Sequence, residues 1–408
     1  MSQIWYISWS KSGPKMRTLD FPADMLELIR RYIKEKSELK RFNRLSLAER
    51  DIVFYSESES YWPYFAPIIN SLIKHHKRTV AYLTSSENDP ILSQHREGIN
   101  AFYIGSGYVR TVAFVTLDAN VFVMTTPGLE TTHLKRSKLP VHYVFLPHNM
   151  TSTHMVFQLG AHNAFDTIFC VGPHQKNELR EAEELYGIKP RDLVEGGYAR
   201  LDNIMRKAKH YPQQCPKGGL RILIAPTWGK EALIGYGCEP LLNALLKAGH
   251  TVILRPHRDS EIQDADRLAQ LDKKYIGKMG FNWAKNMSRE DSFYRSDLLI
   301  TDWSGAAFSF AFGLERPVLS IDLPTKINNK DFGRFTNVPL EISLREKMGG
   351  VLAPDKFSDA PMVIEEILRD TEQITKNLRA MRETWVYRSG DAADYAAAHI
   401  IKLAEQKS

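Results

Sequence analysis

The feature that most constrains the fold is an alternation of short β-rich runs with segments of helical period, which occurs in two series along the chain. Strand-like runs separated by amphipathic helices predict parallel sheets with helices on both faces. The first series has strand-like runs at 51–57, 79–85, 120–126, 141–147 and 166–172, and helical patterns at 64–76 and 173–187. The second has strand-like runs at 220–228, 250–257, 297–303 and 316–322, and a helical pattern at 240–249. We therefore expect an α/β protein with two doubly wound, Rossmann-like domains that face a central cleft.

A break between the two series divides the chain. Residues 209–219 (KHYPQQCPKGG) replace periodic apolar residues by proline, glutamine and glycine, which is typical of a linker between domains. A length of 408 residues also exceeds one ordinary core and fits two. We expect a first domain over 1–212, a second over 213–385, and a C-terminal helix over 386–408 that returns to the first domain.

Composition and cysteine content indicate a folded intracellular protein. Apolar content is 43% and charged content 25%, both ordinary for a globular chain. Cys170, Cys215 and Cys238 lie far apart and show no paired spacing, which argues against a disulfide framework or a zinc site. No signal peptide and no apolar stretch long enough to cross a bilayer is seen. We expect a cytoplasmic location.

The net charge of +6 is mild but unevenly spread. Basic residues concentrate between Arg30 and Arg50, where apolar residues recur at helical spacing. One interpretation is a solvated helix face. The alternative is a basic amphipathic helix that contacts anionic lipid, or a lipid-linked acceptor, at the inner face of the membrane. We expect no nucleic-acid partner.

Polar side chains follow four of the expected strands, where doubly wound sheets bind ligands. They are His148, Thr227, the pair Arg255 and His257, and the turn Thr301-Asp302-Trp303-Ser304-Gly305. Arg255 and His257 alternate along a strand, so both can face one phosphate. A helix starts directly at Ser304-Gly305, whose backbone N–H groups suit an anion. The alternatives are that His148 only ends a loop and that Asp302 only caps a helix.

Several common sites lack their sequence signals. No G-x-G-x-x-G follows the first strand and no G-x-x-x-x-G-K-[ST] occurs, which argues against nicotinamide binding and P-loop chemistry. Acidic residues are not grouped with histidine at metal-ligand spacing, and no D-x-D stands at a strand end. We expect no cofactor and a mechanism without a metal.

Five motifs together resemble the CDP-glycerol glycerophosphotransferase family, the teichoic-acid and capsule enzymes with the GT-B fold. They are VHYVFLPHNMTSTHM, GGYARLD, ILIAPTW, LRPH and SDLLITDWSGAAFSFAFGLERPVLSID, in the family's order. The resemblance implies transfer of a polyol phosphate, glycerol phosphate above all, from a CDP donor in the second domain to an acceptor hydroxyl in the first. The acceptor would be a glycan or a lipid-linked polymer.

The resemblance also implies residue roles. His148 corresponds to the general base, and His257 to a histidine that assists at the donor phosphates. The donor pyrophosphate would contact Arg255, Thr227, Thr301, Asp302, Ser304 and Gly305. Acceptor-side candidates are Glu57, Ser58, Tyr61, Ser152 and His154, of which His154 is the rival for the base.

Two positions depart from the family pattern. Gly305 stands where the family has a second serine, and Asn149 follows His148 where the family has glycine. Two other functions stay open: a GT-B glycosyltransferase that uses a nucleotide sugar, and a nucleotide-binding protein without catalysis. The motifs also leave open the polyol, the acceptor, and whether one unit or a polymer is added.

Overall fold

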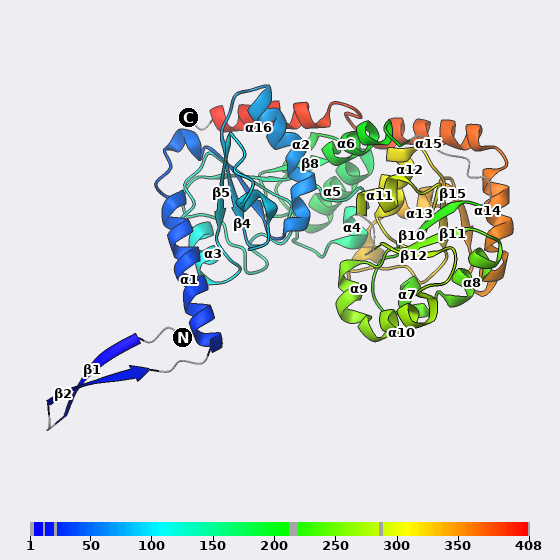
Figure 1. Cartoon of the computed structure of the whole chain (residues 1–408). Helices are drawn as coiled ribbons and strands as arrows, with labels where there is room; N and C mark the ends of the chain where they lie inside the picture. Colours follow the sequence, from blue (N-terminus) through cyan, green and yellow to red (C-terminus); the bar gives the residue numbers. More distant parts are fainter. Residues whose placement is uncertain (1–3, 11–12, 20–22, 212–218, 285–288, 407–408) are drawn as a thin grey trace.

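The computed structural model describes residues 4–10, 13–19, 23–211, 219–284 and 289–406. Most of the chain folds into two domains, each built on a parallel sheet that helices cover on both faces (Figure 1). The prediction of two Rossmann-like domains is confirmed. The predicted linker at 209–219 lies largely outside the described residues.

The first sheet has seven parallel strands in the order β5-β4-β3-β6-β7-β8-β9. Their bounds are β3 Ile52–Ser56, β4 Val80–Thr84, β5 Ile99–Tyr103, β6 Val121–Met124, β7 His142–Phe145, β8 Thr167–Cys170 and β9 Asp192–Glu195. Alternate residues point to opposite faces and join different cores. Val53 and Tyr55 pack with Phe114 on one face, while Ile52 and Phe54 belong to the core on the other.

Helices cover both faces of this sheet. They are α1 Ala23–Phe42, α2 Trp62–Lys74, α3 Tyr108–Val115, α5 Pro173–Tyr186, α6 Ala199–Ala208 and α16 Ala392–Glu405. The last helix, α16, belongs to this domain's core although it ends the chain: Ala396 and Ile400 are buried with Phe65 and Leu72. In Figure 1, α15 and α16 run along one side of both domains.

The second sheet has six parallel strands in the order β12-β11-β10-β13-β14-β15. Their bounds are β10 Arg221–Ile224, β11 Thr251–Leu254, β12 Phe281–Trp283, β13 Leu298–Thr301, β14 Val318–Ile321 and β15 Gly349–Leu352. The main covering helices are α8 Glu239–Lys247, α10 Ala265–Tyr275, α12 Ala306–Leu314, α14 Ala360–Leu368 and α15 Thr371–Trp385. The strand order reverses between β10 and β13, which is the position where such sheets bind ligands.

The two domains share an apolar contact between α6 and α12. Leu201 and Ile204 of α6 lie in one buried cluster with Phe308 and Phe312 of α12. At Gly313 a Cβ would lie 2.4 Å from Ile204 Cγ2, closer than real Cβ atoms come, so glycine permits this close approach of the helices. This contact fixes the carboxyl ends of the two sheets near each other.

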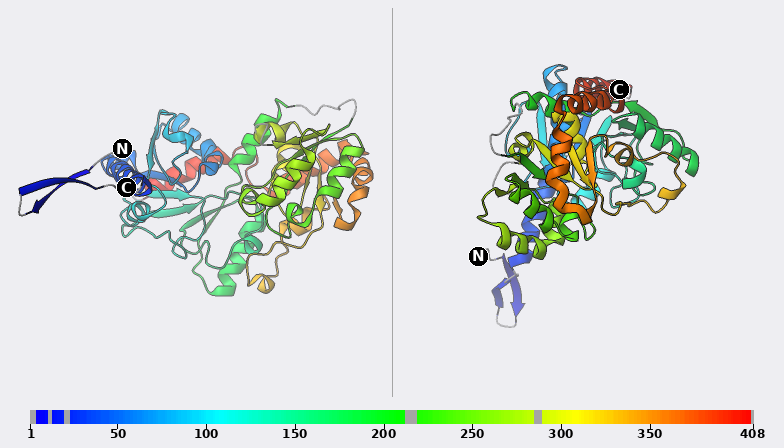
Figure 2. Two further views of the ribbon diagram at one scale, coloured as in Figure 1. Left: turned by 60° about the horizontal axis from the view of Figure 1, so that its bottom comes forward. Right: turned by 90° about the vertical axis from the view of Figure 1, so that its right-hand side faces the viewer.

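The N-terminal segment stands apart from both sheets. Strands β1 Ile4–Ser10 and β2 Gly13–Leu19 pair as an antiparallel hairpin. Figures 1 and 2 show this hairpin beyond the start of α1, clear of the first domain. The second half of α1 packs on the domain through Leu39 and Phe42, while its first half exposes apolar side chains. The hairpin was not predicted from the sequence.

Candidate active site at the contact of the two domains

His148 follows β7 and is held by the end of the neighbouring strand β6. Its Nδ1 lies 3.0 Å from the carbonyl oxygen of Thr125 and 3.1 Å from the Thr125 hydroxyl oxygen. A carbonyl oxygen only accepts, so Nδ1 carries the proton in the neutral ring and Nε2 carries the lone pair. His148 is therefore oriented to accept a proton at Nε2.

Aromatic rings surround the His148 imidazole. The ring centroids of Tyr61, Phe157 and Tyr64 lie 5.6, 6.0 and 6.2 Å from it. Burial lowers the pKa of His148 below its usual value, and the positive charge of Arg200 lowers it further. The imidazole is consequently neutral at pH 7, the form that a general base needs.

In the second domain, Thr301 and Asp302 shape the turn after β13. The buried Thr301 hydroxyl donates to the Ala225 carbonyl oxygen at 2.8 Å. The Asp302 carboxylate accepts from the backbone N–H groups of Thr227 at 2.7 Å and Leu233 at 3.0 Å. Burial raises the pKa of Asp302, and these N–H groups oppose that shift. Both side chains thus tie the ends of β10 and β13 together.

The Ser304-Gly305 turn lies against the segment that follows His148. Ser304 Oγ accepts from the Ala306 N–H at 3.3 Å, at the start of α12. A Cβ at Gly305 would lie 3.3 Å from Thr151 Cγ2 and 3.9 Å from the Asn149 Cβ. The two departures from the family pattern, Asn149 and Gly305, are therefore neighbours across the domain contact, with the larger residue on one side facing the smaller on the other.

His257 follows β11 and caps α9 (Arg258–Gln263). Its Nδ1 accepts from the Asp259 backbone N–H at 3.1 Å, so the ring proton is on Nε2. The side chain is 42% exposed, and its ring lies 6.4 Å from the Trp228 ring. The Arg255 guanidinium lies 5.6 Å from the centroid of Phe293. His257 presents an N–H donor, whereas His148 presents a lone pair.

Arg258 connects this segment to the first domain. Its guanidinium lies 3.1 Å from Ser58 Oγ and 3.3 Å from Glu59 Oε1. Burial raises the pKa of Tyr61 to about 12, with contributions from Glu57, Tyr64 and the Asp259 carboxylate of the second domain. The residues after β3 and after β11 therefore face each other beside His148.

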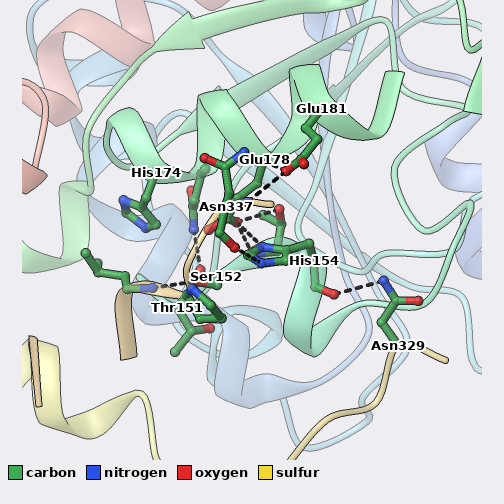
Figure 3. A network of polar contacts seen from close by, with 12 residues as sticks. Thr151, Ser152, His154, His174, Glu178, Glu181, Asn329 and Asn337 are labelled. Atoms are coloured by element: carbon green, nitrogen blue, oxygen red, sulfur yellow. Dashed lines mark hydrogen bonds and ion pairs between the residues drawn. The ribbon is translucent and has the colours of Figure 1, made fainter. Parts of the chain in front are cut away.

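The other acceptor-side candidates are placed differently. Glu57 stays within the first domain, 3.3 Å from His133 Nε2 and 3.5 Å from Arg110. Ser152 and His154 are buried in a polar network, where Ser152 bonds Glu341 and His154 lies against Glu178 and Asn337 (Figure 3). The structure thus brings Ser58 and Tyr61 to the donor-side residues, whereas Glu57 pairs within the first domain and Ser152 and His154 bond residues of the polar network.

Four further residues join the site without having been singled out from the sequence. Tyr64 and Arg200 lie beside His148, and Arg258 bridges the domains. Lys326 donates from Nζ to the Trp228 carbonyl oxygen at 2.9 Å and lies 3.4 Å from the Trp228 ring centroid. Arg200 lies in the GGYARLD motif, which was a usable signal. Tyr64 opens the helical pattern at 64–76 and Arg258 directly follows LRPH, but neither pattern singles out the residue, and Lys326 lies outside the motifs.

The described residues contain no group of three His, Cys, Asp or Glu side chains that could hold a metal ion. None of the helices described is both long and apolar enough to cross a bilayer.

Comparison with solved structures establishes the fold. A UDP-GlcNAc 2-epimerase of Methanocaldococcus jannaschii, solved with UDP-GlcNAc and UDP, gives a TM-score of 0.55 at 12% identity, covering 86% of this chain and 99% of that one. A glycosyltransferase of Rickettsia africae gives 0.53 at 10% identity, covering 88% and 100%. A UDP-GlcNAc 2-epimerase of Neisseria meningitidis bound to UDP-GlcNAc gives 0.51 at 13%, covering 86% and 99%. At these identities the similarity shows the GT-B fold alone.

Comparison with sequences establishes the family. No curated protein sequence matches the chain significantly. A family model described as CDP-glycerol:poly(glycerophosphate) glycerophosphotransferase matches residues 42–332. The matched range runs from the end of α1 past β14 and takes in the His148 and Ser304 segments of both domains. The chain therefore belongs to the CDP-glycerol:poly(glycerophosphate) glycerophosphotransferase family, a family of transferases.

Proposed function

We propose that the protein transfers a polyol phosphate, glycerol phosphate above all, from a CDP-activated donor to an acceptor hydroxyl. The observation that carries the proposal is the position of His148. It has a lone pair at Nε2, and the residues that follow it contact the Ser304-Gly305 turn of the other domain. A base from one domain and an anion-binding helix start from the other are the two groups that phosphoryl transfer requires.

The reaction is an in-line displacement at the phosphorus that carries the polyol. The acceptor oxygen forms a bond to this phosphorus while its proton passes to His148 Nε2. The bond from phosphorus to the bridging oxygen of the donor breaks, and CMP leaves with the electron pair. The N–H of His257, the charge of Arg255 and the start of α12 stabilise the negative oxygens.

The acceptor is a hydroxyl of a cell-surface glycan or of a lipid-linked polymer, as in teichoic-acid or capsule synthesis. The support is the family membership together with Ser58 and Tyr61, which lie on the first-domain side of the His148 group. A sugar transferase with this fold would attack an anomeric carbon, where a carboxylate base is more usual than a histidine.

A donor screen tests the proposal. The protein is incubated with CDP-glycerol, CDP-ribitol or UDP-sugars and an acceptor, and the released nucleotide is identified by mass. We expect CMP from a CDP-polyol, with full activity retained in excess chelator because Arg255 supplies a positive charge and His257 an N–H donor. Release of UDP from a UDP-sugar, with no CMP from either CDP-polyol, would contradict the proposal.

We also propose that α1 contacts an anionic membrane surface. Its first half exposes Leu28 at 65% and Ile33 at 60%, with Met25, Ile29 and Tyr32 also exposed. Lys34 and Arg31 lie on the same helix, although both have acidic neighbours, Glu87 and Glu35. An exposed apolar stripe beside basic residues suits the boundary between headgroups and acyl chains.

Co-sedimentation with vesicles tests this contact. We expect binding to vesicles that contain phosphatidylglycerol, weaker binding to phosphatidylcholine alone, and loss of binding in Leu28→Glu/Ile33→Glu. Leu47→Glu is the matched control, because Leu47 is 63% exposed but lies outside α1. Equal binding by the double variant and the wild type would show that α1 does not make the membrane contact.

A further inference from the structure

Arg200 is a half-buried cation with an unusual set of neighbours. It lies in the first turn of α6, where its Nη1 contacts the Tyr64 hydroxyl and its guanidinium lies 4.6 Å from the Tyr64 ring centroid. The hydroxyls of Tyr198 and Tyr294 also lie close enough to act on its charge. Its polar surroundings are thus phenols, which are neutral at pH 7.

Three other buried arginines are neutralised by carboxylates, whereas the buried Arg316 donates to three backbone carbonyl oxygens instead. Arg110 pairs with Glu57, Arg191 with Glu183 and Arg382 with Glu315. Among the described residues, no carboxylate lies within ion-pair distance of Arg200. An uncompensated charge at a half-buried position is unfavourable unless an anion joins it. The arrangement is therefore that of a cation held ready for an anionic ligand.

The position of Arg200 indicates where that anion lies. Its charge is near enough to His148 to lower the pKa of that residue. The Tyr198 hydroxyl donates to the His148 carbonyl oxygen at 2.9 Å, which fixes the two segments to each other. A small recess at Arg200 is lined by Tyr64 and by Pro147, the residue before His148, and otherwise largely by apolar side chains of the first domain. Tyr294 approaches Arg200 from the second domain, so the guanidinium belongs to the same domain contact.

We propose that Arg200 is the phosphate-binding residue of the first domain, with its guanidinium on a phosphate oxygen next to the hydroxyl that His148 deprotonates. This inference rests on the proposed function. A planar guanidinium presents paired N–H donors that match a phosphate, and the Tyr64 contact keeps it from rotating away. The phosphate belongs either to a phosphorylated acceptor or to the polyol phosphate that the donor delivers.

Direct binding tests the inference without requiring turnover. Calorimetric titration uses glycerol 3-phosphate, which lacks the nucleotide, and CDP, which lacks the polyol. We expect Arg200→Gln to weaken binding of glycerol 3-phosphate ten- to hundredfold, the loss of one charge-assisted bond. Unchanged CDP binding in this variant places the phosphate on the acceptor side, and equally weakened CDP binding places it on the donor.

Two further variants separate charge from structure. Arg200→Lys keeps the charge and should recover part of the affinity. Arg206→Gln is the matched control, because Arg206 lies on the same helix, is exposed and bonds only Asn203 among the contacts described. The inference is overturned if the wild type binds neither probe, or if a folded Arg200→Gln binds both within twofold of the wild type.

The pH profile supplies a readout that a purely structural role would not change. The groups facing His148 are Thr125, Tyr61, Tyr64, Phe157 and Arg200, and the His148 charge in turn acts on the buried His162. Removing the positive charge in Arg200→Gln should move the acid limb of kcat/KM to higher pH. Arg206→Gln leaves the Arg200 charge and its Tyr64 contact unchanged and should leave the limb in place. An unmoved limb in Arg200→Gln contradicts the placement beside the base.

Discussion

His148 and His257 occupy similar positions along their strands but are held in opposite tautomers. The Thr125 carbonyl takes the Nδ1 proton of His148, whereas the Asp259 N–H occupies the Nδ1 lone pair of His257. One ring is thereby a proton acceptor at Nε2 and the other a proton donor. The sequence places both at strand ends, but the partner of His148 lies on another strand and leaves no signal in the motif.

The roles of Thr301 and Asp302 also depend on partners that the sequence motif does not reveal. The motif predicts a turn that binds an anion, and the turn lies at the reversal of strand order, as expected. The sequence could not separate side chains that build the turn from those that face a ligand. That distinction depends on residues that follow β10. The Ala225 carbonyl oxygen accepts from Thr301, and the Thr227 and Leu233 N–H groups donate to Asp302.

Donor affinity should depend on His257 and Ser304. Loss of one charge-assisted contact removes about 1.5–3 kcal/mol, so His257→Ala and Ser304→Ala should each weaken CDP binding roughly ten- to hundredfold. Isothermal titration with CDP measures this. Ser309→Ala serves as the control, because Ser309 lies inside α12 and not at its start. Wild-type affinity in both site variants would show that the donor pyrophosphate lies elsewhere.

At the scale of elements, the strands of the two parallel sheets that were not predicted from the sequence share one property. β5, β9, β12 and β15 are the four edges of the two sheets. Each contains partly or fully exposed positions, as in β9, where only the two central residues are buried. Central strands of parallel sheets are buried on both faces and read as continuous apolar runs, but edge strands lose that pattern. The interior strands were therefore predictable and the edges were not.

The polar network of Figure 3 joins the segment after β14 to the first domain. Ser152 donates from its backbone N–H to the Glu341 carboxylate at 3.0 Å and accepts from the Leu340 N–H at 2.8 Å. His154 donates from Nε2 to the Asn337 carbonyl at 2.9 Å, and its Nδ1 lies 3.3 Å from Glu178. Burial lowers the pKa of His154, but Glu178 and Asn337 outweigh it and raise the value. Both ring nitrogens face acceptors, so His154 stabilises the domain contact as a cation.

Glu341 should make stability depend on pH in a defined direction. Burial, with the nearby Glu178 charge, raises its pKa from 4.5 to about 7. The folded state then holds a proton that the unfolded state loses, so the free energy of unfolding falls between about pH 4.5 and 7, by on the order of 3 kcal/mol. Glu341→Gln keeps an oxygen for the Ser152 N–H and should remove this fall.

Chemical denaturation at several pH values measures how steeply the free energy of unfolding changes with pH. The raised pKa of His154 contributes in the same direction, since its stabilisation is lost as pH rises, so the comparison is the difference between Glu341→Gln and the wild type. Glu346→Gln, at an exposed position on the same segment, is the control. A variant slope equal to that of the wild type would show that Glu341 does not titrate in this range.

At the scale of the whole molecule, the contact between the two domains is buried on one side and more exposed on the other. The α6–α12 contact and the His154–Glu341 network are buried, whereas the side near His148 is bridged by Arg258 on Ser58 and Glu59. Exposed ion pairs contribute about 0–1 kcal/mol. We therefore expect any opening between the domains to occur on the Arg258 side, with the buried contacts as the pivot.

Arg258→Ala should consequently lower turnover more than stability. We expect kcat/KM to fall several-fold because the closed arrangement is populated less, while Tm stays close to that of the wild type. Thermal unfolding and steady-state rates provide both values. Arg379→Ala, which breaks a surface pair with Glu315 inside the second domain, should change neither rate nor Tm appreciably. A large loss of Tm in Arg258→Ala would make this contact part of the pivot instead.

The most direct test of the account compares His148→Ala with His154→Ala, measuring donor affinity and turnover separately. His148 lies on the first domain, so His148→Ala should bind CDP nearly as well as the wild type, while turnover falls by about 10²–10⁴, the usual share of a general base. The acid limb of the rate profile should vanish with the imidazole. His154→Ala should lose stability but keep most of its turnover per folded molecule. Near-normal turnover in His148→Ala, with collapse in a folded His154→Ala, would contradict the account.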